Sequence, residues 1–464
     1  MRIGVLACVL ALVWAPAAQA QAPDGQKALA RAILSDIVAM DTSPEGGRTP
    51  AMAAYLADRL RAGGFPAADV HVVPQGEVAA LVVRYRGDGT GGRPILLLAH
   101  MDVVPARRAD WARDPFTLVE ENGYFFGRGA ADNKSGIAAL TTQFLSLRAE
   151  GFMPTRDLII VFTGDEETSG ASAAGLLRDH RALVDAEFAL NTDAGEGVLS
   201  ETTGAPVSYT VQTAEKSFAS FTLMARNPGG HSSRPRPDNA IYDLADALGR
   251  VRAYEFPVQW NETTLASLRA AGAVTDGPLG AAMTRFAQRP GDRRAAATLS
   301  ASPAHIGQIR TTCVPTLLAA GHADNALPQS ATATINCRVF PGVAIESVQQ
   351  TLQTLAGPAI AVAPLDTYFA SPASPLRADV MAAITKAVHA SYPGVPVTPG
   401  MSAGATDGVF FRAAGIPTYG AGEIFMKDSD DFAHGLNERI PVASFYNGLT
   451  HWRVLLTTLA GPRP

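Results

Sequence analysis

Acidic side chains and histidines stand in five short segments of the sequence, each directly after an apolar run or just before a helical one. In chain order they are His100 and Asp102; Asp132; Asp165, Glu166 and Glu167; Asp193; and His434. Imidazole nitrogens and carboxylate oxygens are ligands that Zn²⁺ accepts. Carboxylates gathered at one place raise one another's pKa values unless a cation compensates their charge. The pattern predicts two divalent cations that share a bridging carboxylate, activate a water molecule and polarise a carbonyl group.

Buried strands are expected to bring these segments together. Ile95–Ala99, Leu158–Phe162 and Phe188–Leu190 are short, continuous apolar runs, which fit strands covered on both faces. A helical pattern over residues 137–147 separates the first two runs. Strands alternating with helices predict an α/β domain with a mostly parallel sheet and helices on both faces. Because ligands of an open parallel sheet bind outside the carboxyl ends of its strands, we expect one edge to gather all five segments.

A separate domain is expected between two α/β parts of the chain. Strand-like alternation at Val207–Gln212 and Ala219–Met224, followed by a helical pattern at Ala240–Arg252, indicates an inserted α+β domain. A polar, alanine-rich stretch over 253–303 makes this domain longer than a minimal lid needs. The predicted organisation is a signal peptide at 1–20, a catalytic domain at 21–205 and 369–464, and a lid or dimerisation domain at 206–368.

Composition and the first residues bear on compartment and partners. The net charge of −5 over 464 residues gives no basic field for nucleic acid. No apolar run after residue 20 approaches the ~20 residues that span a bilayer, so no membrane partner is expected. Met1–Ala20 has the layout of a secretory signal with cleavage after Ala20, which predicts a secreted or periplasmic protein. Export permits a disulfide between Cys313 and Cys337, which a predicted hairpin would place opposite each other; two free buried thiols are the alternative.

Five motifs together resemble a known family. They are HMDVVP (100–105), GRGAADNKSG (127–136), GDEE (164–167), GGHSS (229–233) and HGLNE (434–438). Their kind and order resemble the di-zinc exopeptidases and amidohydrolases that include carboxypeptidase G, aminoacylase, carnosinase and succinyl-diaminopimelate desuccinylase. The resemblance implies a catalytic domain of the zinc-exopeptidase type with an inserted ferredoxin-like lid domain.

The resemblance also implies a set of metal ligands. In it, His100 and Asp193 hold one zinc ion, Glu167 and His434 hold the other, and Asp132 bridges both. The bridging aspartate of the family precedes a cis peptide bond, so we expect the Asp132–Asn133 bond to be cis. Two Zn²⁺ per chain are expected, with Co²⁺ or Mn²⁺ as substitutes.

Five further residues receive roles from the same resemblance. Asp102 would orient His100 through its other ring nitrogen. Glu166 would be the general base that takes a proton from the attacking water and later gives it to the leaving amine. His231, from the lid domain, would stabilise the oxyanion, often across a dimer interface. Asn325 and Arg338 resemble positions that grip a substrate carboxylate, for which the arginine fork is suited.

The sequence therefore predicts an exported zinc-dependent metallopeptidase of carboxypeptidase or dipeptidase type. It would hydrolyse a peptide or amide bond next to a free carboxylate, in a small peptide or an N-acyl amino acid. Either a homodimer through the lid domain is expected or, as in some branches of the family, the insertion over 253–303 takes the place of the partner subunit. An N-acyl-amino-acid amidohydrolase with the same site is the alternative. Asp193, where some branches of the family carry Glu, favours the aminoacylase and dipeptidase side.

Two distant alternatives come from other classes. Residues 400–404 match the nucleophile-elbow pattern Gly-x-Ser-x-Gly, with Ser402 as nucleophile, His434 downstream and Asp407 or Asp430 between them. The elbow needs a strong strand before it, and Val395–Pro399 contains two prolines, which is poor strand material. A non-catalytic binding protein on the same fold is the other alternative, and Glu166 argues against it because pure binding needs no general base.

Overall fold

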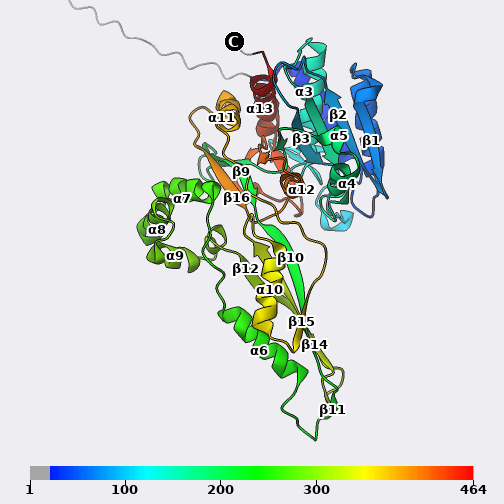
Figure 1. Cartoon of the computed structure of the whole chain (residues 1–464). Helices are drawn as coiled ribbons and strands as arrows, with labels where there is room; N and C mark the ends of the chain where they lie inside the picture. The colour runs from blue at the N-terminus through cyan, green and yellow to red at the C-terminus, as the bar shows by residue number, and fades with distance from the viewer. Residues whose placement is uncertain (1–20, 463–464) are drawn as a thin grey trace, which may run out of the picture.

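The computed structural model describes residues 21–462, and the predicted signal segment lies outside them. A broad α/β domain carries a narrow arm, which extends away from it (Figure 1). Among the described residues, every helix is too short or too polar to cross a bilayer.

The α/β domain is built on a ten-stranded sheet in the order β1-β2-β6-β3-β7-β17-β9-β8-β18, with β16 paired to β9. The strands are β1 (Val70–Gln75), β2 (Val78–Tyr85), β3 (Ile95–His100), β6 (Leu158–Thr163), β7 (Phe188–Asn191), β8 (Glu196–Leu199), β9 (Pro206–Glu215), β16 (Val397–Ser402), β17 (Thr418–Gly420) and β18 (Phe425–Met426). Strand β3 lies parallel to both β6 and β7, and β17 lies parallel to β7. The mostly parallel α/β sheet predicted from the apolar runs is therefore confirmed.

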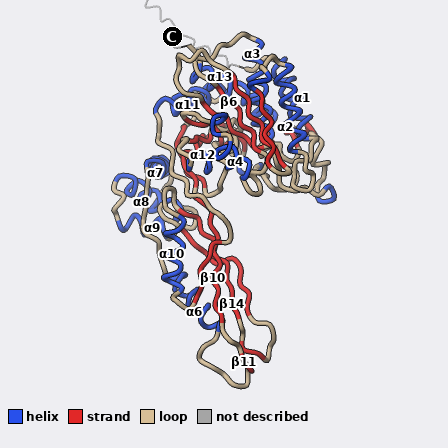
Figure 2. Tube along the Cα trace, turned by 45° about the vertical axis from the view of Figure 1, so that its right-hand side comes forward, coloured by secondary structure: helices blue, strands red, loops and turns tan. Residues whose placement is uncertain are grey.

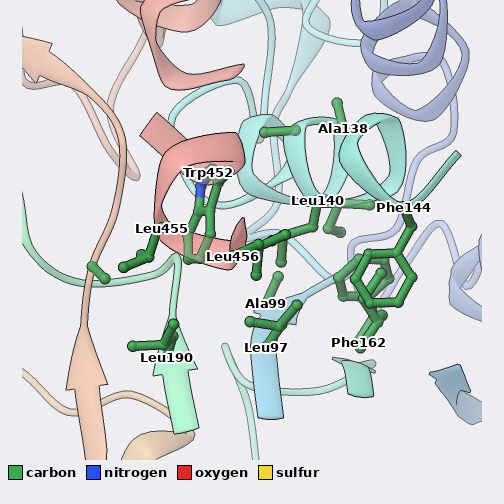
Figure 3. Packing of buried hydrophobic residues seen from close by; sticks show 14 of the residues in the cluster. Leu97, Ala99, Ala138, Leu140, Phe144, Phe162, Leu190, Trp452, Leu455 and Leu456 are labelled. Carbon is green, nitrogen blue, oxygen red and sulfur yellow. The ribbon is translucent and has the colours of Figure 1, made fainter. Parts of the chain in front are cut away.

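Helices cover both faces of this sheet. One face carries α1 (Asp24–Val38), α2 (Thr49–Ala62), α3 (Lys134–Ala149), α11 (Ala378–Ser391) and α13 (Val442–Ala460); the other carries α4 (Ala171–Asp179), α5 (Arg181–Val184) and α12 (Gly408–Ala413). Leu97 packs with Leu140 of α3 and Trp452 of α13 (Figure 3), whereas Leu96 and Leu98 enter the core on the opposite face. Since successive side chains of a strand point to opposite faces, burial on both makes β3 continuously apolar.

Smaller elements complete the described part of the chain. A three-stranded sheet joins β4 (Val119–Glu121), β5 (Tyr124–Phe126) and β19 (Arg439–Pro441). Short 3₁₀ turns are η1 (Ala67–Asp69), η2 (Arg108–Asp110), η4 (Asp428–Asp430) and, before β12 (Thr312–Ala320), η3 (Ile306–Gln308).

The arm is the predicted ferredoxin-like lid. Its elements follow as β10 (Ser217–Arg226), α6 (Ala240–Ala253), β12 (Thr312–Ala320), β14 (Ser330–Val339), α10 (Ile345–Ala356) and β15 (Ile360–Pro364). They form an antiparallel sheet in the order β12-β14-β10-β15, the β-α-β-β-α-β arrangement of that fold. A short ribbon of β11 (Gly230–His231) and β13 (Ala326–Leu327) lies at the far end of the arm (Figure 2). Cys313 and Cys337 face each other in register and form a disulfide bond.

The lid begins later than the sequence predicted. Strand β9 pairs with β8, β16 and β17, so it belongs to the large sheet, and the lid starts at Ser217 rather than at residue 206. The half-exposed alternation of β9 reflects its solvent-exposed first residues, while its last five residues are buried.

The alanine-rich stretch folds as a helical insertion between α6 and β12. It consists of α7 (Glu262–Val274), α8 (Gly277–Gln288) and α9 (Arg293–Ser300). These helices pack around a separate hydrophobic core, which includes Leu268, Phe286 and Ile309. The strand that carries Cys313 begins only at Thr312, because residues 306–308 before it form the turn η3.

The strand before Ser402 was also predicted wrongly. Residues Val397–Ser402 form β16 and run parallel to β9, despite Pro399. A proline fits here because β16 pairs with β9 alone, which leaves its other edge without ladder hydrogen bonds.

Candidate metal centre

The predicted ligands meet at one edge of the large sheet. His100 ends β3, Glu167 follows β6, and Asp193 follows β7. Asp132 lies just before α3, and the peptide bond between Asp132 and Asn133 is cis, as expected. His434 comes from the loop after β18 and has a positive φ of 61°, an uncommon conformation for a residue with a Cβ.

Asp132 lies between two histidines. His100 Nε2 is 2.8 Å from Asp132 Oδ1 and 3.3 Å from Asp193 Oδ1. His434 Nε2 is 3.1 Å from Asp132 Oδ2 and 3.0 Å from Glu167 Oε2. The two oxygens of Asp132 thus face different imidazoles, which is the placement of a carboxylate that bridges two cations.

Two overlapping sets of ligand atoms are close enough to hold ions. The ligand atoms of His100, Asp132 and Glu167 lie within 4.8 Å of one another, and so do those of His100, Glu166 and Asp193. Nitrogen and carboxylate donors in this number suit Zn²⁺ and related divalent ions. The donor set therefore fits a metal pair, and it places Glu166 near enough to act either as a base or as a ligand.

Asp102 supports the site through two different groups. His100 Nδ1 donates to the backbone oxygen of Asp102 at 3.0 Å, which leaves Nε2 free to bind a cation. The carboxylate of Asp102 accepts hydrogen bonds from the backbone N–H groups of Glu166 and Glu167, at 3.1 and 2.9 Å. Asp102 therefore orients the histidine and also fixes the turn that carries both glutamates.

Glu438 is a positioning residue that sequence reasoning missed. Its Oε1 accepts hydrogen bonds from the backbone N–H groups of Ala131 and Asp132, at 2.7 and 3.0 Å. Its Oε2 accepts from Gly129 N at 3.0 Å and from Arg128 Nη1 at 2.7 Å. The carboxylate is fully buried and holds the loop that presents Asp132. The position of Glu438 in the HGLNE motif, four residues after His434, could have indicated this role.

The pKa values of the site show that its buried carboxylates do not all ionise together without added positive charge. Burial, reinforced by Asp193, raises the pKa of Glu166 to about 10, and burial raises the pKa of Asp193 to about 7. Burial also opposes ionisation of Asp132, but hydrogen bonds from His100 and His434 outweigh it and lower the pKa of Asp132. The hydrogen bond with Asp132 raises the pKa of His434 to about 9. Added positive charge at this point would allow all the carboxylates to ionise together.

A cavity of about 750 Å³ opens onto the site. Asp132, Glu166, Asp193 and His434 are among the residues that line it. The segment that ends β16 and continues beyond it also lines the cavity, as do Ser267 and Gln308 of the helical insertion and the turn that follows it. The helical insertion therefore contributes to the same cavity as the predicted metal ligands.

Arg338 lies beside this cavity. It is half-buried, and its Nη1 donates to the backbone oxygen of Ala403 at 2.9 Å. The neighbours of Ala403, Ser402 and Gly404, line the cavity. Among residues 21–462, no carboxylate forms an ion pair with Arg338, which leaves its charge available to an anionic ligand.

His231 and Asn325 are not at the cavity of their own chain. His231 lies in β11, and Asn325 accepts a hydrogen bond from Ser232 N at 3.0 Å, so both belong to the far end of the lid (Figure 2). Within one chain these two residues therefore lie away from the cavity, and the roles expected for them, for His231 across a dimer interface, stay predictions.

The side chains of a serine-hydrolase triad do not come together. Ser402 Oγ accepts a hydrogen bond from Gly404 N at 3.0 Å, whereas His434 contacts Asp132 and Glu167. Asp407 accepts from Thr163, and Asp430 pairs with Arg439 at 2.7 Å. The segment after Ser402 is a loop rather than the helix that an elbow requires.

The fold and the site define a metal-dependent hydrolase. The sequence profile of peptidase family M20/M25/M40 matches residues 96–458, and the chain belongs to this family.

Relatives and solved structures agree with this assignment. The chain is 30% identical over 355 residues to the N-fatty-acyl-amino acid synthase/hydrolase PM20D1 of Xenopus tropicalis, covering 75% of this chain and 69% of the relative. It is 26% identical over 417 residues to aminoacylase-1 of Sus scrofa, covering 88% and 90%. The fold resembles an M20 family metallo-carboxypeptidase from Sulfolobus solfataricus with a TM-score of 0.68, at 18% identity, covering 93% and 99%. The chain is therefore an enzyme of the metallopeptidase and amidohydrolase class.

Proposed function

We propose that this enzyme is an exported, di-zinc hydrolase of carboxypeptidase or dipeptidase type, which cleaves a peptide or amide bond next to a free carboxylate. The observation that carries the proposal is the placement of Asp132 between His100 and His434, with Asp193 and Glu167 beside them. His100, Asp193 and Asp132 would hold one Zn²⁺, and His434, Glu167 and Asp132 the other. The proposed secreted or periplasmic location rests on residues 1–20 of the sequence.

The chemistry follows from the side chains around the ligands. When bound, the metal pair polarises the scissile carbonyl and acidifies the attacking water. Glu166 lies close to His100 and Asp193 and is nearly buried, so it takes the proton from that water and returns it to the leaving nitrogen. Asp102 and Glu438 hold the turn and the loop that carry Glu166 and Asp132, which keeps the reacting groups in place.

Arg338 would bind the free carboxylate of the substrate. Its guanidinium has no acidic partner in the described chain and lies against the loop that borders the cavity. A planar guanidinium can bind a carboxylate with two parallel hydrogen bonds.

An N-acyl-amino-acid amidohydrolase is the second candidate. The names of the relatives favour it, since one is described as acting on N-fatty-acyl amino acids and another as an aminoacylase. Both candidates use the same metal centre and the same carboxylate contact, and they differ only in what lies on the acyl side of the scissile bond.

A homodimer through the lid domain would complete the site. Strand β12 is an edge strand and exposes Val314, Leu317 and Leu318. Exposed apolar side chains on an unpaired edge strand favour association with another chain. In such a dimer His231 and Asn325 would serve the cavity of the second copy, His231 as the oxyanion contact.

Replacing Glu166 tests the proposal. In Glu166→Ala, kcat for a dipeptide or N-acyl amino acid should fall by about 10³-fold or more, while zinc content stays near two per chain. The exposed Glu45→Ala is the control and should match the parent enzyme. Chelation should abolish activity, Zn²⁺ should restore it, and a serine-directed reagent should have no effect.

Each other outcome has a clear meaning. Loss of zinc in Glu166→Ala would make Glu166 a ligand rather than the base. Full activity of metal-free protein, or of Glu166→Ala, would overturn the proposed function.

A further inference from the structure

Asp193 lies two residues beyond the end of β7, in a turn that a buried asparagine closes. Asn191 is the last residue of β7 and is 1% exposed. Its side-chain oxygen accepts a hydrogen bond from the backbone N–H of Asp193 at 3.1 Å. A short polar side chain that bonds to the backbone two residues later holds a turn in one conformation. Asn191 therefore fixes the turn that presents the carboxylate of Asp193.

The amide nitrogen of Asn191 is held in turn by Thr406. Asn191 Nδ2 donates to Thr406 Oγ1 at 3.2 Å, and Gly408 N donates to the same oxygen at 3.0 Å. Thr406 lies in the loop after β16, is buried, and lines the cavity. The nitrogen of the Asn191 amide thus faces an acceptor while its oxygen faces a donor. Both contacts favour the same orientation of the amide, so Thr406 helps to hold the turn.

A buried ion pair anchors Thr406. The backbone N–H of Thr406 donates to Glu215 Oε2 at 2.8 Å, and Glu215 Oε1 pairs with Arg412. Arg412 Nη2 also donates to Gln212 Oε1 at 3.1 Å and to Thr418 O at 2.9 Å. Both charged side chains are fully buried, and a buried charge that loses its partner is strongly unfavourable. The ion pair therefore gives Thr406 a fixed position.

The loop over residues 402–407, which contains Thr406, is held at its other end by the root of the lid. Strands β9 and β16 lie side by side where the arm leaves the catalytic domain (Figure 1). Lys216, between β9 and β10, donates from its backbone N–H to Ser402 O at 3.0 Å. Arg338 of β14 donates to Ala403 O at 2.9 Å. The loop therefore connects the root of the lid with the turn that carries a predicted metal ligand.

The other two predicted carboxylate ligands are held by different groups. Asp132 is supported by Glu438, and the turn of Glu167 is supported by Asp102. Neither of these supporting carboxylates belongs to the loop over residues 402–407. A change in that loop should therefore displace Asp193 and leave the other two carboxylates in place.

We propose that Thr406 and Asn191 are positioning residues that act together on Asp193 and so set the affinity for one of the two metal ions. The inference rests on the proposed function, in which Asp193 binds one ion, Glu167 binds the other and Asp132 binds both. Its consequence is that the two metal affinities separate when the contact between Thr406 and Asn191 is removed.

Thr406→Val tests the inference, because valine keeps the shape of the side chain and removes the hydroxyl group. Zinc titration against a competing chelator should show one ion bound about 10- to 100-fold more weakly, the range for loss of a group that supports a metal ligand. Affinity for the other ion should stay within a few-fold. At limiting zinc kcat should fall, and it should recover as zinc is raised, while KM changes little. Thr406→Ser, which keeps the hydroxyl group, should retain both affinities.

Thr142→Val is the matched control. Thr142 is buried in α3, and within the described chain its hydroxyl group has no hydrogen-bond partner, so the same substitution should leave both zinc affinities unchanged. Asn191→Leu removes the proposed contact from its other side and should separate the two affinities as Thr406→Val does. Unchanged affinities in Thr406→Val, or an equal weakening of both ions, would overturn the inference.

Failure of this inference can be told apart from failure of the proposed function. If the parent enzyme binds two zinc ions and shows Glu166-dependent hydrolysis, and only the Thr406→Val result fails, the proposed function stands. If the parent binds no zinc, or cleaves neither a dipeptide nor an N-acyl amino acid, the proposed function itself fails.

Discussion

The contact between Glu438 and the Asp132 loop allows a quantitative test of how the metal centre is held. The change is Glu438→Gln, which keeps the size of the side chain but removes its charge. One carboxylate oxygen becomes an NH₂ group that faces N–H donors, and the buried Arg128 loses the negative charge that pairs with it. Breaking a buried ion pair on one side costs about 3–5 kcal/mol, and we expect the free energy of unfolding to fall by that amount.

Metal affinity should fall as well. Two of the four groups that bind Glu438 are the backbone N–H groups of Ala131 and Asp132, so their loss releases the bridging ligand from its position. Loss of a residue that supports a metal ligand weakens metal binding by about 10- to 100-fold. Urea unfolding followed by tryptophan fluorescence, and zinc titration against a competing chelator, measure the two effects.

The control is Glu150→Gln. Glu150 pairs with Arg453 at the surface, where an ion pair contributes about 1 kcal/mol or less. Burial raises the pKa of Glu438, while Arg128 and the backbone amides of Gly129 and Asp132 oppose that rise. The fall in the free energy of unfolding in Glu438→Gln therefore reports whether Glu438 binds the loop in its ionised form. A Glu438→Gln protein within 1 kcal/mol of the parent and with unchanged zinc affinity would refute the reasoning.

Two further predictions concern pH and assembly. Burial lowers the pKa of His451 from 6.5 to about 4, so the neutral histidine contributes fully to stability above pH 6.5, and this contribution is lost as the pH falls toward 4. The free energy of unfolding should therefore fall by about 3 kcal/mol over this range in the parent protein but not in His451→Gln. The same pH dependence of unfolding in both proteins would contradict this prediction. Leu318→Glu, at the exposed edge of β12, should convert the dimer to monomers, as measured by sedimentation. Val274→Glu, on the exposed surface of α7, is the control and should leave the dimer intact. A parent enzyme that is monomeric at micromolar concentration would rule out the lid dimer.

Local sequence was sufficient for the elements and for the ligand types. The apolar runs that end at Ala99, Phe162 and Leu190 predicted strands correctly, because burial on both faces leaves a continuous apolar pattern in the chain itself. Parallel strands direct their carboxyl ends to a common edge, so His100, Glu167 and Asp193 could be expected to meet. The five motifs added the cis bond at Asp132 and the ferredoxin-like lid, both of which the structure contains.

Tertiary structure decided how distant parts of the chain face one another. Only the direction of β10 shows that His231 and Asn325 lie at the tip of the arm, and only the docking of α7 on β16 brings Gln308 to the cavity. Strand β9 belongs to the large sheet, and Pro399 is accommodated in a strand. The neighbouring strands with which they pair decide both outcomes, and their own local sequence does not. Pairing, docking and charge compensation are contacts between residues tens to hundreds of positions apart, and a local pattern of residue types carries no record of them. The chain's own sequence thus determined which side chains can do the chemistry, and the packing of its domains decided which of them share one cavity.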